Sequence, residues 1–337
     1  MTATLPPVTP VPRVVARRPS WLPGPRLLPT LATFVLFVAL FAAGSLRYEG
    51  FFAAQVVLNL FVDNAFLIVL AVGMTFVILT GGIDLSVGAV MAFTGMLAAK
   101  LLSTGVPTGV VIPLMIASGA VFGLIIGVLV NYFDVQPFIA SLAGMFLARG
   151  LCFVVSLEAV QVKDTTVLGL QSVKLGTFEW YITPTGIIAL LVIVVAAWVL
   201  GYTRFGRTVY AIGGNEQSAR LMGLPVARTK VLVYVISGVC AGVAGLLFTA
   251  YTAAGYSLNG IGTELDTIAS VVIGGTLLAG GSGYVIGSLI GVLVYGVIKV
   301  SITFLGADSS WTRITIGILL LVFVVVQRVL VARGSRR

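Results

Sequence analysis

The chain has 337 residues, of which 59% are hydrophobic and only 9% charged, and its mean hydropathy is +1.13. Soluble globular domains contain far more charge, so this composition excludes them and indicates an all-α polytopic protein of the lipid bilayer. The formal net charge is +9. In a membrane protein such an excess sets the orientation of loops, and it does not indicate a nucleic-acid partner.

Residues 1–26 contain prolines and arginines without apolar periodicity, and we expect a disordered cytoplasmic tail there. Residues 27–332 form the expected transmembrane domain, because they consist of successive apolar runs near the ~20 residues that a membrane helix needs. Residues 333–337 are expected to be a basic cytoplasmic tail. The runs predict about ten transmembrane helices, at about 27–46, 52–79, 85–102, 110–131, 138–156, 184–202, 231–251, 265–278, 284–305 and 311–331.

Basic residues gather in three parts of the chain: before the first predicted span, in the central loop 203–229, and after the last span. Lys and Arg accumulate in cytoplasmic loops, and an even number of spans places all three groups on one side. Both termini are therefore expected in the cytoplasm. The longest external segment, 158–183, alternates Val and Thr in places and is compatible with a small hairpin.

Residues 51–157 and 229–332 each contain about four predicted spans, numbers 2–5 and 7–10, and each contains a glycine-rich break. Because the second and seventh spans cross in opposite directions, this is the pattern of an inverted repeat. In transporters such repeats place the pathway between the halves near the midplane. The residue-level similarity of the two stretches is weak, so the repeat and two unrelated halves both stay open.

The first break consists of Gly81 and Gly82 followed by Asp84, and it interrupts the apolar region that begins near Asn64. Breaks occur in hydrocarbon only where the backbone is buried in protein, lines an aqueous cavity or reaches the surface, so this region is a candidate for the translocation path. Asp84 would line the path or, alternatively, cap the helix starting at Leu85. Asn64 would contact a hydroxylated solute or bond to a neighbouring helix.

Arg149 lies roughly two-thirds of the way along an apolar run, too deep to reach the membrane surface as ordinary end-of-helix residues do. It would be a path or gate residue or, alternatively, the structural partner of a backbone carbonyl or a carboxylate. Asp266 precedes another apolar run. It would cap that helix or line an external vestibule together with Glu264.

Several chemistries are excluded by residue types that are missing. There is no histidine, the usual general base and commonest metal ligand. There is no Gly-Lys dipeptide, so the chain has no phosphate-binding GxxxxGK[ST] loop and is not by itself a conventional ATPase. Cys152 and Cys240 fall in apolar runs and are expected to be small buried residues. We therefore expect no enzyme activity, metal site or cofactor.

The central loop contains a short helix-forming segment, from Glu216 to Leu221, which Gly223 and Pro225 would end. The preceding Gly213-Gly214-Asn215 predicts a turn. Such a short amphipathic helix in a cytoplasmic loop is suited to docking into a groove of a partner protein. The alternative is a solvated basic loop that only sets the topology.

Three segments, DNAFLIVLAVGMTFVILTGGIDLSVGAVMAFTG (63–95), GGNEQSARLMGL (213–224) and ELDTIASVVIGGTLLAGG (264–281), resemble the permease subunits of bacterial ABC importers for ribose, xylose and galactose. Within the first, 63–90, together with AGYSLNGIGTELDTIASVVIGG (254–275) and SSWTRITIGILL (309–320), looks most like the galactofuranose importer permease. The resemblance extends over nearly the whole chain after residue 50. The proline-rich tail before residue 27 departs from it.

The resemblance implies a bacterial inner-membrane subunit that works with a separate ABC ATPase, a second permease chain and a periplasmic sugar-binding protein. It implies that 81–86 and 274–281, including Gly274 and Gly275, belong to the central pathway. It also implies that 215–223 is the coupling helix held by the ATPase. The implied coupling residues are Asn215, Glu216, Ser218, Ala219, Met222 and Gly223.

The rival interpretation is a secondary transporter that moves sugar alone by ion coupling, for which broken helices and an inverted repeat are equally typical. A proton-coupled carrier usually needs a titratable carboxylate in mid-membrane, whereas the acidic residues here lie mostly near the ends of predicted spans. A receptor-like membrane protein without transport would have no need of the glycine breaks. Energy dependence separates the two transport classes.

Overall fold

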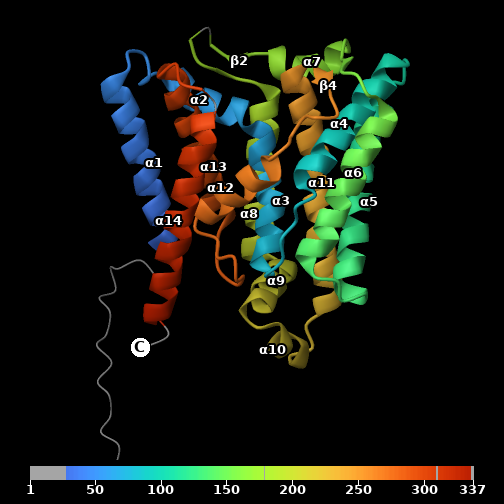
Figure 1. The fold of residues 1–337 in the computed structure, drawn as a ribbon, viewed down its shortest axis with the longest axis vertical. Coiled ribbons are helices and arrows are strands. Elements are labelled where there is room, and N and C mark those ends of the chain that lie inside the picture. The colour runs from blue at the N-terminus through green and yellow to red at the C-terminus, as the bar shows by residue number, and fades with distance from the viewer. Residues whose placement is uncertain (1–27, 178, 309, 335–337) are drawn as a thin grey trace, which may run out of the picture.

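The computed structural model describes residues 28–177, 179–308 and 310–334, which are mainly helical (Figure 1). The helices are α1 (Leu28–Arg47), α2 (Ala54–Asp63), α3 (Ala65–Leu79), α4 (Val87–Ser103), α5 (Thr108–Tyr132), α6 (Pro137–Val155), α7 (Thr165–Ser172), α8 (Pro184–Tyr202), α9 (Arg204–Gly214), α10 (Glu216–Leu221), α11 (Val226–Thr252), α12 (Thr263–Ile273), α13 (Val285–Phe304) and α14 (Ser310–Gly334). The strands are β1 (Val160–Gln161), β2 (Leu175–Gly176), β3 (Tyr181–Ile182) and β4 (Ala254–Gly255).

The strands form two antiparallel pairs, β1 with β4 and β2 with β3. The β2–β3 pair is the small hairpin expected within 158–183. Figure 1 shows β2, β4 and α7 at one end of the helices and α9 and α10 at the other. The polar segments between the long helices therefore lie at the two ends of the molecule.

Six of the described helices, α1, α5, α6, α8, α11 and α13, are long and apolar enough to cross a membrane. A seventh span is formed if the bent pair α2–α3 counts as one. The expectation of about ten spans is not confirmed. The clearest difference is at 265–278, where α12 has 11 residues and rises about 16 Å, roughly half the ~30 Å hydrocarbon core.

The physical reason for the short α12 is the run of glycines that follows it. Gly275, Gly280 and Gly281 have φ values of +96°, +85° and +74°, which L residues with side chains rarely adopt. The chain therefore leaves the helix at Gly274 and returns to helix only at Val285. The apolar run in the sequence hid this loop.

The span predicted as continuous over 52–79 is broken at Asn64, where α2 and α3 meet at 59°. Asn64 has φ −111° and ψ 16°, outside the helical region, and its side-chain amide donates to Leu60 O at 2.9 Å. Residues 1–27 and 335–337 lie outside the described residues, and so does the expected N-terminal tail. Of the basic tail expected at 333–337, Arg333 and Gly334 are the last residues of α14, and the rest is not described. The inverted repeat stays a prediction.

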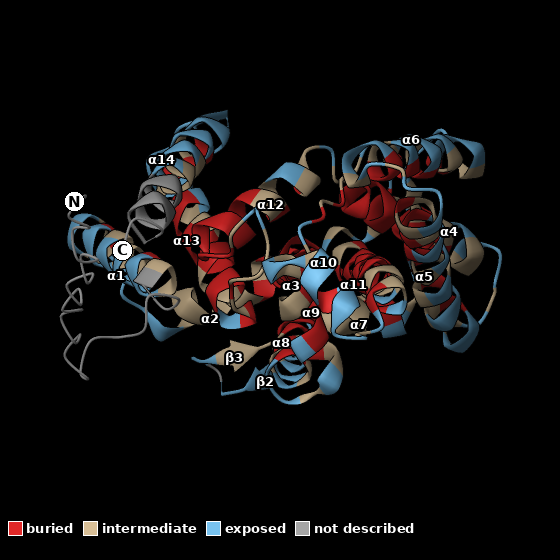
Figure 2. Ribbon diagram, turned by 90° about the horizontal axis from the view of Figure 1, so that it is seen from below, coloured by how far each residue is buried: buried red, intermediate tan, exposed pale blue. Residues whose placement is uncertain are grey.

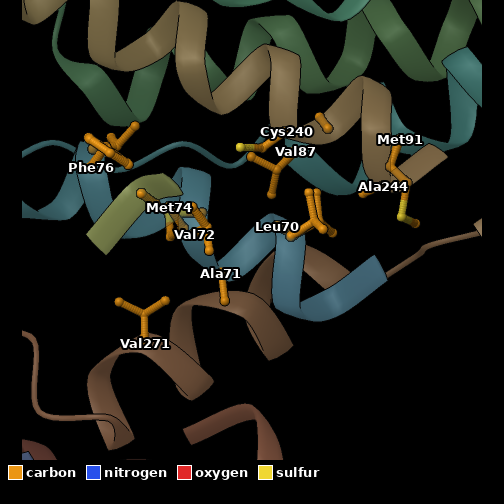
Figure 3. Close-up of a cluster of buried hydrophobic side chains, with 14 of the residues drawn as sticks. Leu70, Ala71, Val72, Met74, Phe76, Val87, Met91, Cys240, Ala244 and Val271 are labelled. Atoms are coloured by element: carbon orange, nitrogen blue, oxygen red, sulfur yellow. The ribbon is translucent and has the colours of Figure 1, made fainter. Parts of the chain in front are cut away.

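Helix α3 runs through the centre of the molecule (Figure 1), and every residue of it except Phe66 is buried. A helix that is apolar on all sides is stable only when other elements surround it. Figure 3 shows its side chains, among them Leu70 and Met74, packed against residues of α4, α11 and α12. Cys152 and Cys240 are buried and free, as the sequence predicted.

The outer surface of the helix assembly is apolar. Figure 2 shows exposed residues along the outer sides of α1, α5, α6 and α8, while the inward sides of α5, α6 and α8 contain buried residues. Phe146, Val154 and Val194 are exposed by 66%, 80% and 67%. Large apolar side chains at such exposures fit hydrocarbon surroundings and not water.

Candidate coupling and translocation site

The two glycine breaks predicted from the sequence meet in the structure. Gly281 N donates to Leu79 O at 2.9 Å, which joins the loop after α12 to the last turn of α3. Gly280 lies so close to the first break that a Cβ added there would be 2.8 Å from Gly81 N. Two segments about 200 residues apart in the chain therefore touch through their backbones. Each segment depends on glycine at the contact.

Helix α9 contributes a third backbone to this contact through Gly213. A Cβ added at Gly213 would collide with Leu79 O and with Gly281 N. We call this meeting point of Leu79, Gly81, Gly213, Gly280 and Gly281 the glycine junction. The sequence predicted the two breaks, but it predicted neither their contact nor helix α9. The N-cap of α9 is Thr203, whose hydroxyl accepts from Gly206 N at 3.1 Å.

The turn predicted at 213–215 begins two residues too early. Gly213 and Gly214 are the last residues of α9, and the turn is at Asn215, which has an extended backbone conformation. In the sequence, Gly213 and Gly214 are a turn signal. At Gly213 the structure gives another reason for glycine, because the backbones at Leu79 and Gly281 leave no room for a side chain. At Gly214 no atom lies within 4 Å of an added Cβ.

Asp84 is 1% exposed and accepts three hydrogen bonds. Its Oδ1 accepts from Ser86 N at 2.9 Å and from Ser86 Oγ at 2.6 Å, and its Oδ2 accepts from Ser237 Oγ at 2.8 Å. The carboxylate thus holds the turn before α4 and ties it to α11. Gly82 passes beside Tyr234, whose buried hydroxyl has no hydrogen-bond partner among the described residues.

We expect Asp84→Ala to lower the free energy of unfolding by about 1–3 kcal/mol for each buried donor left without an acceptor. Thermal unfolding of the purified protein in detergent checks this. Asp84→Asn is the matched variant, because it keeps one acceptor oxygen and should lose less. Equal stability of the alanine variant and the unchanged protein would show that these three bonds are not structural.

Asn64 lines a cavity of about 200 Å³ at the bend between α2 and α3. The other lining residues include Asp63, Tyr251, Lys299 and Thr303. Polar groups of both charges and a phenol ring surround this space, a composition that suits hydroxyl groups of a solute. The Asn64 amide bonds to Leu60 O of α2, the helix that ends just before it, so the alternative of a bond to a separate neighbouring helix is not confirmed.

Asp266 lies in the first turn of α12, where Gly262 and not Asp266 is the N-cap residue. Its Oδ2 accepts from the Tyr295 hydroxyl of α13 at 3.3 Å. Lys299, one turn further along α13, interacts electrostatically with Asp266 and with Asp63 of the Asn64 cavity. The structure therefore brings Asn64 and Asp266 to the same region, on the side away from α10.

Arg149 and the pair Gly274 and Gly275 lie apart from the glycine junction. The Arg149 Nη1 donates to Ser257 O and Asn259 O, both at 2.7 Å. These are backbone carbonyls, as expected if Arg149 has a structural role and not a role in the path. A Cβ at Gly274 would collide with the backbone of α13, and one at Gly275 with Pro29 and Thr30 of α1. These glycines allow close helix packing in the structure.

The short helix predicted in the central loop is α10, with the predicted bounds Glu216–Leu221. Asn215 Oδ1 accepts from Ser218 N at 2.7 Å, so Asn215 is the N-cap. Ala219 is fully buried against α9 and the start of α11. Leu221 and Met222 are exposed by 84% and 67%, so α10 presents an apolar tip away from the membrane helices.

Glu216 fixes α10 to its surroundings through two ion pairs. Its Oε1 lies 2.6 Å from Arg220 Nη2, and its Oε2 lies 3.0 Å from Lys230 Nζ of α11. Partial burial alone would raise the pKa of Glu216, but the hydrogen bonds and charges of Lys230 and Arg220 outweigh it and hold the pKa below its ordinary value. Gly223, with φ +74°, then turns the chain towards α11.

The depressed pKa of Glu216 predicts a pH dependence. The stabilisation by the charged carboxylate is fully present above its ordinary value near 4.5 and is lost as the pH falls below that value. We expect Glu216→Gln to destabilise the protein equally at pH 6 and pH 8, and the difference to shrink on acidification below about pH 4.5. Unfolding midpoints measured against pH check this, and a difference that grows on acidification would contradict it.

The comparisons with known proteins agree with a transport role. Residues 56–324 match the family described as branched-chain amino acid transport system / permease component. The chain is 43% identical over 319 residues to the fructose import permease protein FruG of Bifidobacterium longum, covering 92% of this chain and 93% of FruG. It is 44% identical over 320 residues to the inner membrane ABC transporter permease protein YjfF of Escherichia coli, covering 93% and 95%.

The ribose import permease protein RbsC of Escherichia coli is 36% identical over 301 residues, covering 87% of this chain and 92% of RbsC. No solved structure matches the chain. The family match spans far more than half of the chain, and the relatives align along nearly their whole length. The chain therefore belongs to this family of permease components, and it is a multi-pass protein of the inner membrane related to the permeases of sugar ABC importers.

Proposed function

We propose that this chain is the membrane-spanning subunit of an ATP-driven ABC importer that takes up a monosaccharide delivered by a periplasmic binding protein. The observation that carries the proposal is the alignment with FruG over more than nine-tenths of both chains. A galactofuranose-like sugar is the favoured cargo, on the resemblance of 63–90, 254–275 and 309–320. The relatives are named as import permeases for fructose and ribose. These names support a monosaccharide as the cargo, but they do not support galactofuranose in particular.

The proposal requires partners. The chain has no GxxxxGK[ST] loop, so a separate ABC ATPase supplies the energy, and a second permease chain, a paralogue or another copy, completes the pathway. The α10 end carries the basic residues Arg204, Arg207, Arg220 and Arg228. By the positive-inside rule this end faces the cytoplasm, where the ATPase is.

The glycine junction gives a route from the ATPase to the pathway. Closure of the ATPase on ATP would push α10, which Ala219 and Glu216 fix to α9 and α11. Helix α9 would transmit the push through Gly213 to the ends of both breaks at once. Tightly packed backbones shift between discrete arrangements, so both halves would change from inward-facing to outward-facing together.

The sugar would cross between the halves, past the Asn64 cavity and Asp266 on the external side. Asn64, Gly81, Gly82, Asp84, Arg149, Asp266, Gly274 and Gly275 stay our proposed path or gate positions. The geometry supports them unequally: Asn64 faces a cavity, whereas Arg149, Gly274 and Gly275 contact backbone. Uptake that is unchanged by Asn64→Ala in an assembled complex would remove Asn64 from the path.

The test of the partners is purification of the tagged chain from its native membrane in mild detergent, with mass spectrometry of the proteins bound to it. We expect an ABC ATPase and a second permease. The double variant Leu221→Asp with Met222→Asp should lose the ATPase and keep the permease. The matched control is Val173→Asp with Leu175→Asp at the opposite end, which should keep both. A chain that purifies alone, in stable form, would contradict the proposal.

A further inference from the structure

A cavity of about 340 Å³ lies where the last turn of α8, helix α9 and the start of α13 come together. Leu200 and Gly201 of α8 form one wall, and Ile286 of α13 forms another. Arg207 and Tyr210 enter from α9. The Tyr210 hydroxyl donates to Gly283 O at 2.8 Å and so fixes α9 to the loop between α12 and α13. Gly281 of the glycine junction also lines the cavity, but none of the proposed path or gate positions does.

The cavity carries one uncompensated positive charge. Within the described residues, the Arg207 guanidinium makes no ion pair and no hydrogen bond. No Asp or Glu is among the lining residues. The other polar or aromatic groups of the lining are the Ser282 hydroxyl and the Tyr210 and Tyr284 side chains. A cationic group above a mixed polar and apolar wall is complementary to an anion attached to an apolar body.

The cavity opens beside a helix face that suits hydrocarbon. Leu191, Val194 and Trp198 of α8 are exposed by 61%, 67% and 59%, and their spacing places them on one side of the helix. Tyr202 follows at the end of α8, next to the cavity. Trp and Tyr gather where the hydrocarbon meets the headgroups. The cavity is therefore at the depth of the headgroups, at the end of the molecule that carries α9 and α10 (Figure 1).

We propose that this cavity binds the phosphate headgroup of an anionic phospholipid in the cytoplasmic leaflet, with Arg207 on the phosphate and an acyl chain along α8. Basic pockets between helices on the cytoplasmic side recognise such lipids through this combination of charge and apolar surface. The leaflet assignment rests on the orientation in the proposed function. The lipid would bridge α8 and α9 beside Gly283, and so stabilise the position of α9 at the glycine junction.

The experiment is native mass spectrometry of the purified chain, with any partners it retains, after delipidation and addition of phosphatidylglycerol or phosphatidylcholine with the same acyl chains. We expect at least one phosphatidylglycerol to be retained where phosphatidylcholine is not. Arg207→Gln should reduce this retention several-fold. Arg204→Gln is the matched control, since it removes the same charge one turn away outside the cavity and should retain the lipid.

A second variant tests the cavity without changing its charge. No atom lies within 4 Å of a Cβ added at Gly201, so Gly201→Leu should fold, fill the cavity and displace the lipid. Equal retention of both lipids, or equal loss in the Arg204 and Arg207 variants, would overturn the proposal. Displacement of phosphatidylglycerol by glycerol 1-phosphate at equal concentration would assign the site to a soluble phosphate instead. None of these readouts uses transport, so they stand apart from the test of the importer.

Discussion

Replacing Gly213 with Val should reduce ATP-driven uptake by about 5- to 150-fold while leaving the ATPase bound. A side chain at this position collides with Leu79 O and Gly281 N, both backbone atoms that cannot rotate away. Overpacking of this kind costs about 1–3 kcal/mol. At about 1.4 kcal/mol per factor of ten, this cost corresponds to the expected reduction in uptake of about 5- to 150-fold. The added side chain acts at the glycine junction, and we propose that the backbones of this junction must rearrange between the inward-facing and outward-facing conformations.

The measurement is uptake by reconstituted complexes together with the ATP hydrolysed per sugar transported. Gly214→Val is the matched control, because the neighbouring glycine has open space at its Cβ, and its uptake should remain close to that of the unchanged protein. The Gly213 variant should still hydrolyse ATP, since α10 is intact. Equal uptake by the two variants would show that α9 does not transmit motion through Gly213.

Replacing Gly238 with Ala is expected to cause a large loss of stability. Helices α5 and α11 touch here through their backbones, and a Cβ at Gly238 would collide with Gly119 O. Membrane helices associate through such close packing, because lipid provides no hydrophobic force between them. The added methyl group should lower the free energy of unfolding by about 1–3 kcal/mol or more, since helix backbones cannot give way as side chains do.

Thermal unfolding in detergent measures this effect. Gly150→Ala in α6 is the control, because nothing lies within 4 Å of its Cβ. That variant should be neutral or gain up to ~1 kcal/mol from the better helix propensity of alanine. A Gly238 variant as stable as the Gly150 variant would mean that α5 and α11 are further apart than described.

The long helices were predictable because hydrocarbon imposes a length and an apolar composition. The predicted runs at 110–131, 138–156 and 184–202 agree with α5, α6 and α8 to within a few residues. The same signal failed at 265–278. There the short α12 and the apolar residues of the following loop read as one run, and only the positive φ of Gly275, Gly280 and Gly281 separates them.

The candidate site was predictable in its parts and not in its assembly. Glycine pairs marked the two breaks, and capping residues marked α10, since both are local properties of the chain. The contact of Gly213 with Leu79 and Gly281 is made by backbone atoms of three distant segments. Glycine is the only trace that such a contact leaves in a sequence, and glycine is also the signal of a simple turn.

The most direct test of the central claim is sugar uptake into proteoliposomes that contain this chain, its co-purified permease and ATPase, and the periplasmic binding protein. We expect a monosaccharide to accumulate only when ATP and the binding protein are both present. Galactofuranose, fructose, ribose and a branched-chain amino acid are compared as cargo. Accumulation of sugar by this chain alone, driven by a proton gradient without ATP, would contradict the account and establish the secondary transporter in its place.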